Sequence, residues 1–346
     1  MDPAMSASGI FVIAHTEPDG TLTRPALEAL GAAKALAAAL GSTFGVGLVG
    51  GDVSPAATQI GSCGAGRILG VSGTEFTQPR YATDAAAAEA LCRAAEPQIV
   101  LAAGTSRWMR VLAGVAQRLG GRIDTHVTRL AVDDGKPTIT RWFYRQRIEG
   151  TVSRADRPWI IGIEPGTHEP WSGASAQARA ESIPVSLPAI RTRVTGIRAP
   201  VGGEQTVRPD AELLFVAGAG WTKKQADGQV HVKDAEKLIL GFLAGSKASL
   251  GGSKSLVDLS GEGREVLSFM THMNQVGQTG SSPRHKKGLS ACCHGEEPHV
   301  VGWRFITERR AVNLNPNCGW AQGKADVLYV ADAFAVMKKL NALLNT

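Results

Sequence analysis

The stretch LSACCHGEEPHVVGW, residues 289–303, holds two adjacent cysteines, two histidines and two glutamates within fifteen positions. Thiolate, imidazole and carboxylate groups at this density occur in metal sites, in redox pairs and in cofactor pockets. Neighbouring residues of a strand point to opposite faces, so Cys292 and Cys293 are poorly placed to bind one tetrahedral ion. The stretch also lacks the Cys-x-x-Cys spacing of structural zinc sites.

We therefore predict that these cysteines pack in a buried strand and that the chain has no metal site. A minor alternative is an iron–sulfur site built from Cys292, Cys293 and Cys318. The five cysteines of the chain form an odd set without repeated spacing, which argues against a disulfide-stabilised secreted domain.

The composition is that of a globular protein with two domains: 346 residues, 43% hydrophobic and 20% charged. The net charge of +6 is modest, and much of it lies in two short runs, 284–287 and 304–310. A nucleic-acid binder usually shows a broader basic stripe with stacking aromatics, so we expect no nucleic acid as partner. Because no apolar run reaches spanning length and the start MDPAMSASG lacks signal-peptide features, we expect a bacterial cytoplasmic protein without direct membrane insertion.

The elements that must position these residues alternate between strand and helix. Apolar runs at 10–14, 44–49, 67–71 and 99–103 predict buried strands, and the apolar spacing of 24–40 predicts a helix. Asp84 is expected to cap an alanine-rich helix that ends before Pro97. Short strands over about 127–166, including PWIIGIEPG, predict an antiparallel extension.

The segment 192–210 is rich in Arg, Pro and Gly without periodicity, and we interpret it as the connection between domains. After it the strand, Gly-rich turn and helix pattern recurs several times. The predicted fold class is α/β with two domains, residues 1–209 and 210–346, each with a mainly parallel sheet flanked by helices. The C-terminal domain is predicted to be doubly wound.

The second domain opens with VAGAGW, in which two glycines follow a strand. Gly218 and Gly220 would let backbone N–H groups approach a phosphate. The third glycine of the GxGxxG fingerprint is missing, which disfavours a nicotinamide dehydrogenase. The chain also has no P-loop and no evident acid/base pair, so a nucleotide-dependent enzyme is disfavoured too.

Six stretches, taken in order, resemble the FAD-binding domain of the electron transfer flavoprotein alpha subunit. They are VAGAGW, GGSKSLVD, NQVGQTG, CCHGEEPHVVG, VNLNPN and ADVLYVADAFAV. The family shows V-S-G-G-R-G, G-A-S-R-A-A-V-D, V-G-Q-T-G, G-I-S-G-A-I-Q-H-L-A-G, I-N-K-D and A-D-Y-G-L-V-G-D at these places. The first half resembles the family's first domain, including its T-S motif at Thr105-Ser106.

The resemblance implies that the cofactor is FAD. Thr279 would lie beside flavin N5, and His299 would hydrogen-bond the C2 carbonyl, where negative charge accumulates on reduction. Lys254 would lie near the isoalloxazine ring, and Asn315 and Asp326 would hold the adenosine part. The full set of implied cofactor-binding residues is Gly218, Gly220, Ser253, Lys254, Gln278, Thr279, Gly280, Gly295, His299, Asn315 and Asp326.

The chain departs from the family pattern close to the expected flavin. The arginine of G-G-R-G is replaced by Gly220, which is followed by Trp221, and the second family arginine is Lys254. Lysine keeps the charge but lacks the planar group that can stack on a ring. Glu296 and Glu297 add carboxylates that would disfavour flavin reduction unless they are paired or point away.

The resemblance further implies an electron carrier subunit rather than a stand-alone enzyme. It would pair with a beta subunit and take electrons from a dehydrogenase, which could be one acting on an N-methylated amino acid such as dimethylglycine. The acceptor would be a membrane-associated quinone oxidoreductase or an iron–sulfur protein. The alternative is a flavin-free structural or assembly subunit with the same fold, for which the lost arginine and the two glutamates argue.

Overall fold

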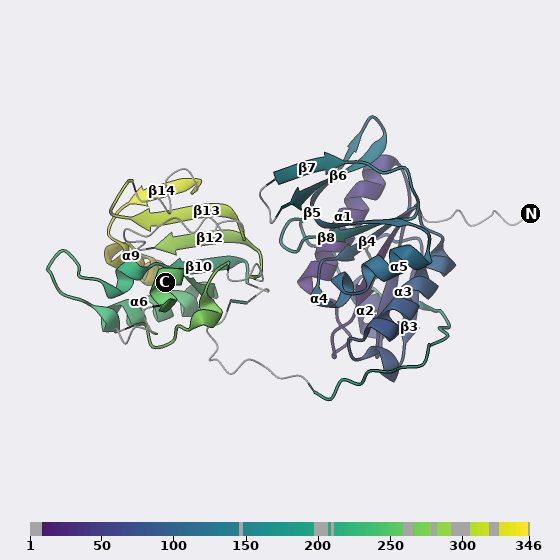
Figure 1. The fold of residues 1–346 in the computed structure, drawn as a ribbon, viewed down its shortest axis with the longest axis horizontal. Coiled ribbons are helices and arrows are strands. Elements are labelled where there is room, and N and C mark those ends of the chain that lie inside the picture. Colours follow the sequence, from purple (N-terminus) through teal and green to yellow (C-terminus); the bar gives the residue numbers. More distant parts are fainter. Residues whose placement is uncertain are drawn as a thin grey trace, which may run out of the picture. The chain divides into compact units, whose positions relative to one another are not determined.

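The computed structural model describes residues 9–144, 148–196, 207–208, 211–258, 266–277, 282–291, 305–317 and 325–344. The chain forms two compact units, Met1–Arg198 and Ala199–Thr346 (Figure 1). This border falls within the predicted connection, whereas the predicted domains meet somewhat later, after residue 209.

The sheet of the first unit has nine strands in the order β7-β6-β5-β8-β4-β1-β2-β3-β9, and all pairings are parallel except β5–β6 and β6–β7. The strands are β1 (Ile10–His15), β2 (Phe44–Gly50), β3 (Ile68–Ser72), β4 (Ile99–Ala103), β5 (Arg122–Asp133), β6 (Lys136–Phe143), β7 (Ile148–Val152), β8 (Trp159–Ile163) and β9 (Glu181–Ser182). The helices are α1 (Arg24–Leu40), α2 (Ser54–Gln59), η1 (Thr74–Phe76), α3 (Tyr81–Ala95), α4 (Ser106–Met109) and α5 (Leu112–Arg118).

Helices cover both faces of this sheet because its central strands are apolar on both sides. In β1, Ile10 and Val12 face a core formed with α1 and α2, while Phe11 and Ile13 face a second core formed with α3 and α5. The helix predicted over 24–40 is α1. It begins at Thr23, whose hydroxyl caps it, and ends at Gly41 with φ +59°, the left-handed conformation that glycine adopts without strain.

Two predictions in this unit are wrong in detail. The stretch PWIIGIEPG forms β8, a fully buried parallel strand between β4 and β5, and not part of the antiparallel extension, which consists of β5, β6 and β7. Asp84 does not cap α3. It lies within the helix with no exposed surface, and its carboxylate accepts hydrogen bonds from the Arg107 guanidinium at 2.7 and 3.0 Å.

The second unit has a five-stranded sheet in the order β11-β10-β12-β13-β14, with parallel pairing throughout. Its strands are β10 (Leu213–Ala217), β11 (Ser249–Gly252), β12 (His285–Ala291), β13 (Ile306–Asn313) and β14 (Val327–Val330). Its helices are η2 (Ala219–Thr222), α6 (Val232–Ser246), α7 (Lys254–Asp258), η4 (His272–Asn274) and α9 (Ala333–Leu344). Apolar side chains of α6, α7 and α9 pack in one core with Phe215 and Ala217 of β10, while Leu214 and Val216 face the opposite side. The predicted α/β fold class, with parallel sheets flanked by helices, is confirmed.

After β8, the chain crosses the first unit without regular structure before it adds β9 to the edge of the sheet. Backbone N–H groups of this segment donate to the carbonyls of Leu27 and Thr58, and Glu181 accepts two hydrogen bonds from Arg67. Gly61 lies under it, because an added Cβ there would approach the Ala176 carbonyl oxygen to 2.1 Å. The segment thereby leads to β9, which pairs with Leu69 and Gly70 of β3, a strand that would otherwise expose unpaired backbone groups at the edge of the sheet.

The antiparallel extension is joined to the parallel sheet through the carboxylate of Asp124, which is 1% exposed. Arg141 donates to it at 2.9 Å, the indole N–H of Trp159 also at 2.9 Å, and Arg154 forms a two-point ion pair with it. Burial alone would raise the pKa of Asp124, but the hydrogen bonds from Arg154, Trp159 and Arg141 outweigh burial and hold that pKa below its ordinary value.

We predict that Asp124→Asn lowers the free energy of unfolding of the full-length chain by about 2 kcal/mol, because the partly exposed guanidinium groups of Arg141 and Arg154 lose the buried carboxylate that accepts their hydrogen bonds. Urea denaturation measures this, with Asp133→Asn, an exposed carboxylate of the same strand, as control. A depressed pKa stabilises the fold above the unfolded value of about 3.9 and loses its effect as pH falls further. The difference between the wild type and Asp124→Asn should therefore shrink below about pH 4, and a constant difference would contradict the assignment.

Candidate functional site

Parallel pairing places the carboxyl ends of all five strands of the second unit on one edge of its sheet. The chain goes from β10 to β11 on one side and then returns to β12 on the other side of β10. In doubly wound sheets, ligands bind outside the carboxyl ends of the strands, at such a reversal of strand order. The site is therefore expected around the turns that follow β10, β11, β12 and β13.

The turn after β10 contains Gly218 and Gly220, as predicted for a phosphate-binding turn. The N–H of Gly218 donates to the Ala291 carbonyl at the end of β12, at 2.9 Å. The Gly220 carbonyl accepts the backbone N–H of Lys223 and the side-chain amide of Gln225. The turn is thus closed on itself and fastened to the neighbouring strand.

The turn after β11 contains Ser253 and Lys254. Ser253 is buried, its N–H donates to the Ala217 carbonyl at 2.9 Å, and its hydroxyl oxygen accepts the N–H of Leu256 at 3.2 Å. The hydroxyl thereby caps α7, whose first residue, Lys254, is exposed to solvent. Lys254 therefore lies at the carboxyl edge, after the strand that pairs with β10.

The described residues that flank the Q-T-G motif lead to the same edge. Gln275 pairs with Gly252 in parallel, and the N–H of Val276 donates to the Gly252 carbonyl at 3.1 Å. The N–H of Gly277 donates to the Ser282 hydroxyl at 2.7 Å. The described residues before and after the motif therefore lie close together, next to β11. Gln278, Thr279 and Gly280 themselves lie outside the described residues.

The turn after β13 places Asn315 at the carboxyl edge as well. Its side-chain oxygen accepts the N–H of Asn317 at 2.9 Å, which closes a short turn after the strand. Gly295 and His299, which follow β12, lie outside the described residues, as do Cys292, Cys293 and Cys318.

Asp326 is not brought together with the other predicted residues. It precedes β14, where its N–H donates to the Arg309 carbonyl and its carboxylate accepts the Arg309 N–H at 2.6 Å. It therefore lies at the amino end of β14, on the edge of the sheet opposite Gly218, Ser253 and Asn315.

Asp332 takes the corresponding place at the carboxyl end of β14. Its carboxylate accepts the N–H groups of Phe334 at 3.4 Å and Ala335 at 3.1 Å, and so caps α9. The stretch ADVLYVAD contains two aspartates, and the second, at the carboxyl edge, also matches the final Asp of the family pattern A-D-Y-G-L-V-G-D.

The dimensions of the edge suit a dinucleotide. Neighbouring strands lie about 4.8 Å apart, so three steps from β11 to β13 span about 14 Å. Over this length the edge offers glycine turns, a lysine and a side-chain amide, and the carboxylate of Asp332 follows one strand further along, after β14. These groups match the phosphates and hydroxyls of a dinucleotide.

The T-S motif, Thr105-Ser106, follows β4 at the carboxyl edge of the first sheet, where it has a structural role. Thr105 caps α4 by accepting the N–H of Trp108, and its hydroxyl lies 3.4 Å from His15 Nε2. Burial, and then the nearby Arg107, lower the pKa of His15 to about 4, so this imidazole is neutral at neutral pH. Trp108 is itself buried beside His15, and the described side chains therefore fill this end of β1 and β4.

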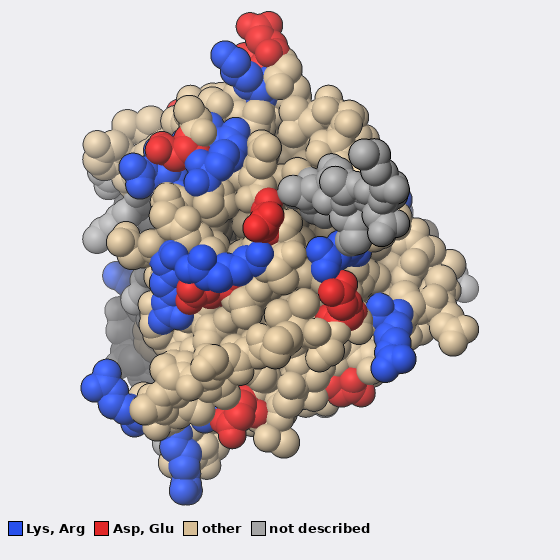
Figure 2. Space-filling model, turned by 90° about the vertical axis from the view of Figure 1, so that its right-hand side faces the viewer, with Lys and Arg blue, Asp and Glu red and all other residues tan. Residues whose placement is uncertain are grey.

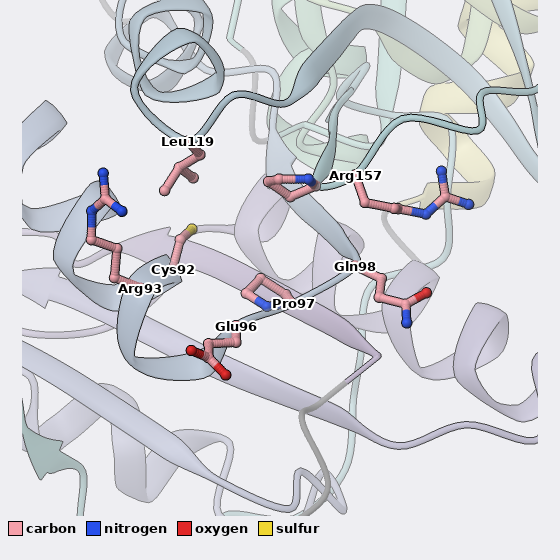
Figure 3. A pocket seen from close by; sticks show the side chains of 8 residues that line it. Cys92, Arg93, Glu96, Pro97, Gln98, Leu119 and Arg157 are labelled. Carbon is pink, nitrogen blue, oxygen red and sulfur yellow. The ribbon is translucent and has the colours of Figure 1, made fainter.

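A pocket of about 490 Å³ opens at the other edge of the first sheet, beside the starts of β4 and β8 (Figure 3). Arg93 and Arg157 lie on its opposite sides, and Arg93 is already paired with Glu89. Burial raises the pKa of the Cys92 thiol to about 12, which makes it unreactive at neutral pH. These groups do not form a catalytic arrangement.

Within the described ranges, no three His, Cys, Asp or Glu side chains are grouped as metal ligands. The same part of the chain has no helix with the length and apolar character needed to span a bilayer. Figure 2 shows one face of the molecule, on which basic and acidic side chains are interspersed.

The electron transfer flavoprotein domain model matches residues 10–189, somewhat more than half of the chain, and the chain therefore belongs to the electron transfer flavoprotein family. It is similar to the electron transfer flavoprotein alpha subunit of Megasphaera elsdenii, with 24% identity over 85% of this chain and 84% of the relative. The alpha subunits of Thermoanaerobacterium thermosaccharolyticum and Clostridium acetobutylicum are each also 24% identical, over 96% of both chains. Membership of this family gives the chain an electron transfer role. The low identities to these relatives make it a divergent alpha-type member.

We predict that Asp332→Asn weakens FAD binding about tenfold, whereas Asp326→Asn changes it less than twofold. A carboxylate at the carboxyl edge can accept hydrogen bonds from ribose hydroxyls, and one at the amino edge cannot reach them. Asparagine keeps one acceptor oxygen, which can still accept the Arg309 N–H at position 326 and one of the two α9 N–H groups at position 332, so each variant retains a backbone hydrogen bond. Fluorescence titration with FAD measures both affinities. A larger effect of Asp326→Asn than of Asp332→Asn would contradict a cofactor site at the carboxyl edge.

Proposed function

We propose that this chain is the FAD-binding alpha subunit of an electron transfer flavoprotein, with FAD along the carboxyl edge of β11, β10, β12 and β13. The observation that carries the proposal is the convergence on this edge of Gly218, Ser253, Lys254, Asn315 and the flanks of Q-T-G. In the sequence these residues are spread over about a hundred positions, and parallel pairing brings them together.

Each group has a defined task in this proposal. FAD supplies an isoalloxazine ring that accepts and releases electrons singly. Lys254 supplies positive charge, and His299 a hydrogen bond at the C2 carbonyl, both of which favour added negative charge. The glycines of the turn after β10 let the diphosphate approach the backbone closely, and Asn315 with Asp332 holds the adenosine part.

The partners follow from the same proposal. The subunit pairs with an electron transfer flavoprotein beta subunit and takes electrons from a dehydrogenase, with one that oxidises N-methylated amino acids as a specific possibility. It passes them to a membrane-associated quinone oxidoreductase or an iron–sulfur protein. Identification of the dehydrogenase that co-purifies with the complex tests the donor.

We predict that the heterodimer purifies with stoichiometric FAD, and that Lys254→Gln weakens FAD binding about tenfold, as expected for loss of a charged contact. Lys237→Gln, which removes an exposed lysine on α6 of the same unit, is the control and should bind FAD like the wild type. The measurements are the visible flavin spectrum, the flavin released by acid and a titration of the apo-complex. A folded heterodimer that neither contains nor binds FAD would instead support the flavin-free assembly subunit.

A further inference from the structure

Trp221 follows the Gly218–Gly220 turn and is completely buried. Its indole N–H donates to the Ala291 carbonyl at 3.1 Å, and that carbonyl also accepts the Gly218 N–H at 2.9 Å. One carbonyl at the end of β12 therefore binds both the beginning and the end of the turn that follows β10.

The opposite side of Trp221 contacts the start of α9. The ring centroids of Trp221 and Phe334 are 4.7 Å apart at an interplanar angle of 52°, the tilted arrangement that aromatic pairs favour. Phe334 is held in turn through its N–H by the carboxylate of Asp332. The same indole therefore connects the turn after β10, the end of β12 and the turn after β14.

A buried indole N–H without an acceptor is costly, so these contacts restrict the three segments to one arrangement. The family pattern V-S-G-G-R-G has a glycine at this place, which cannot make such contacts. The bulky side chain here also directly follows the position at which the family arginine is missing.

We propose that Trp221 is a positioning residue for the FAD site, which holds the turn after β10, the end of β12 and the turn after β14 in the geometry that binds the cofactor. The inference rests on the proposed FAD-binding function and adds to it a residue particular to this chain. Trp221 acts through the backbone that it fixes.

The test compares Trp221→Phe with Trp159→Phe in the heterodimer. Trp159 is equally buried, and its indole N–H donates to Asp124 in the other unit, so each variant loses one buried indole hydrogen bond, to a carbonyl at Trp221 and to a carboxylate at Trp159. We expect Trp221→Phe to raise the dissociation constant for FAD about fivefold to tenfold, as for loss of one buried hydrogen bond, and to alter the visible circular dichroism of bound flavin. Trp159→Phe should lower the thermal midpoint and leave both flavin measurements unchanged.

Phe334→Leu provides a second variant that removes the ring contact and no hydrogen bond, and it decides the matter if Trp221→Phe does not fold. It too should weaken FAD binding. If folded Trp221→Phe, or Phe334→Leu in its place, binds FAD with wild-type affinity and spectrum, Trp221 is ordinary core packing and the inference is wrong. If the wild-type heterodimer binds no FAD, the proposed function fails and this inference fails with it.

Discussion

Parallel pairing of β11, β10, β12, β13 and β14 is the constraint on which the candidate site depends. A parallel sheet puts every strand's carboxyl end on the same edge, whatever the length of the connections between strands. Glycine turns, a capping serine, a lysine and an asparagine from distant parts of the sequence thereby become neighbours. In doubly wound sheets, a reversal of strand order like the one at β10 is where ligands bind.

The sequence was most informative where local physics decides the structure. Apolar runs predicted the parallel strands, and the apolar spacing of 24–40 predicted α1. Sequence-based prediction failed where contacts with residues distant in the sequence determine the structure. Asp84 has the appearance of a helix cap, but the buried guanidinium of Arg107 holds it inside α3. The strand β8 was assigned to the antiparallel extension, because its pairing with β4 and β5 cannot be read from its own residues.

In the candidate site, too, local features could be predicted from the sequence, and features that depend on distant residues could not. The motif order suggested which turns converge, but the choice between Asp326 and Asp332 needed the direction of β14, which places one aspartate at each end of the strand. Trp221 could not be assigned a role from sequence, because its partners, the Ala291 carbonyl and Phe334, belong to other elements. In the first unit, His15 and Trp108 fill the equivalent end of the central strands, so a similar topology does not imply a similar site.

Amide hydrogen exchange of the heterodimer, with and without FAD, tests most directly whether the cofactor lies along the carboxyl edge of the second sheet. The account predicts slower exchange on FAD addition in peptides covering 218–223, 253–257 and 314–317. Peptides at the amino edge, covering 285–287 and 306–309, should exchange at unchanged rates. Protection confined to the amino edge, or no protection at the carboxyl edge when FAD is bound, would contradict the account.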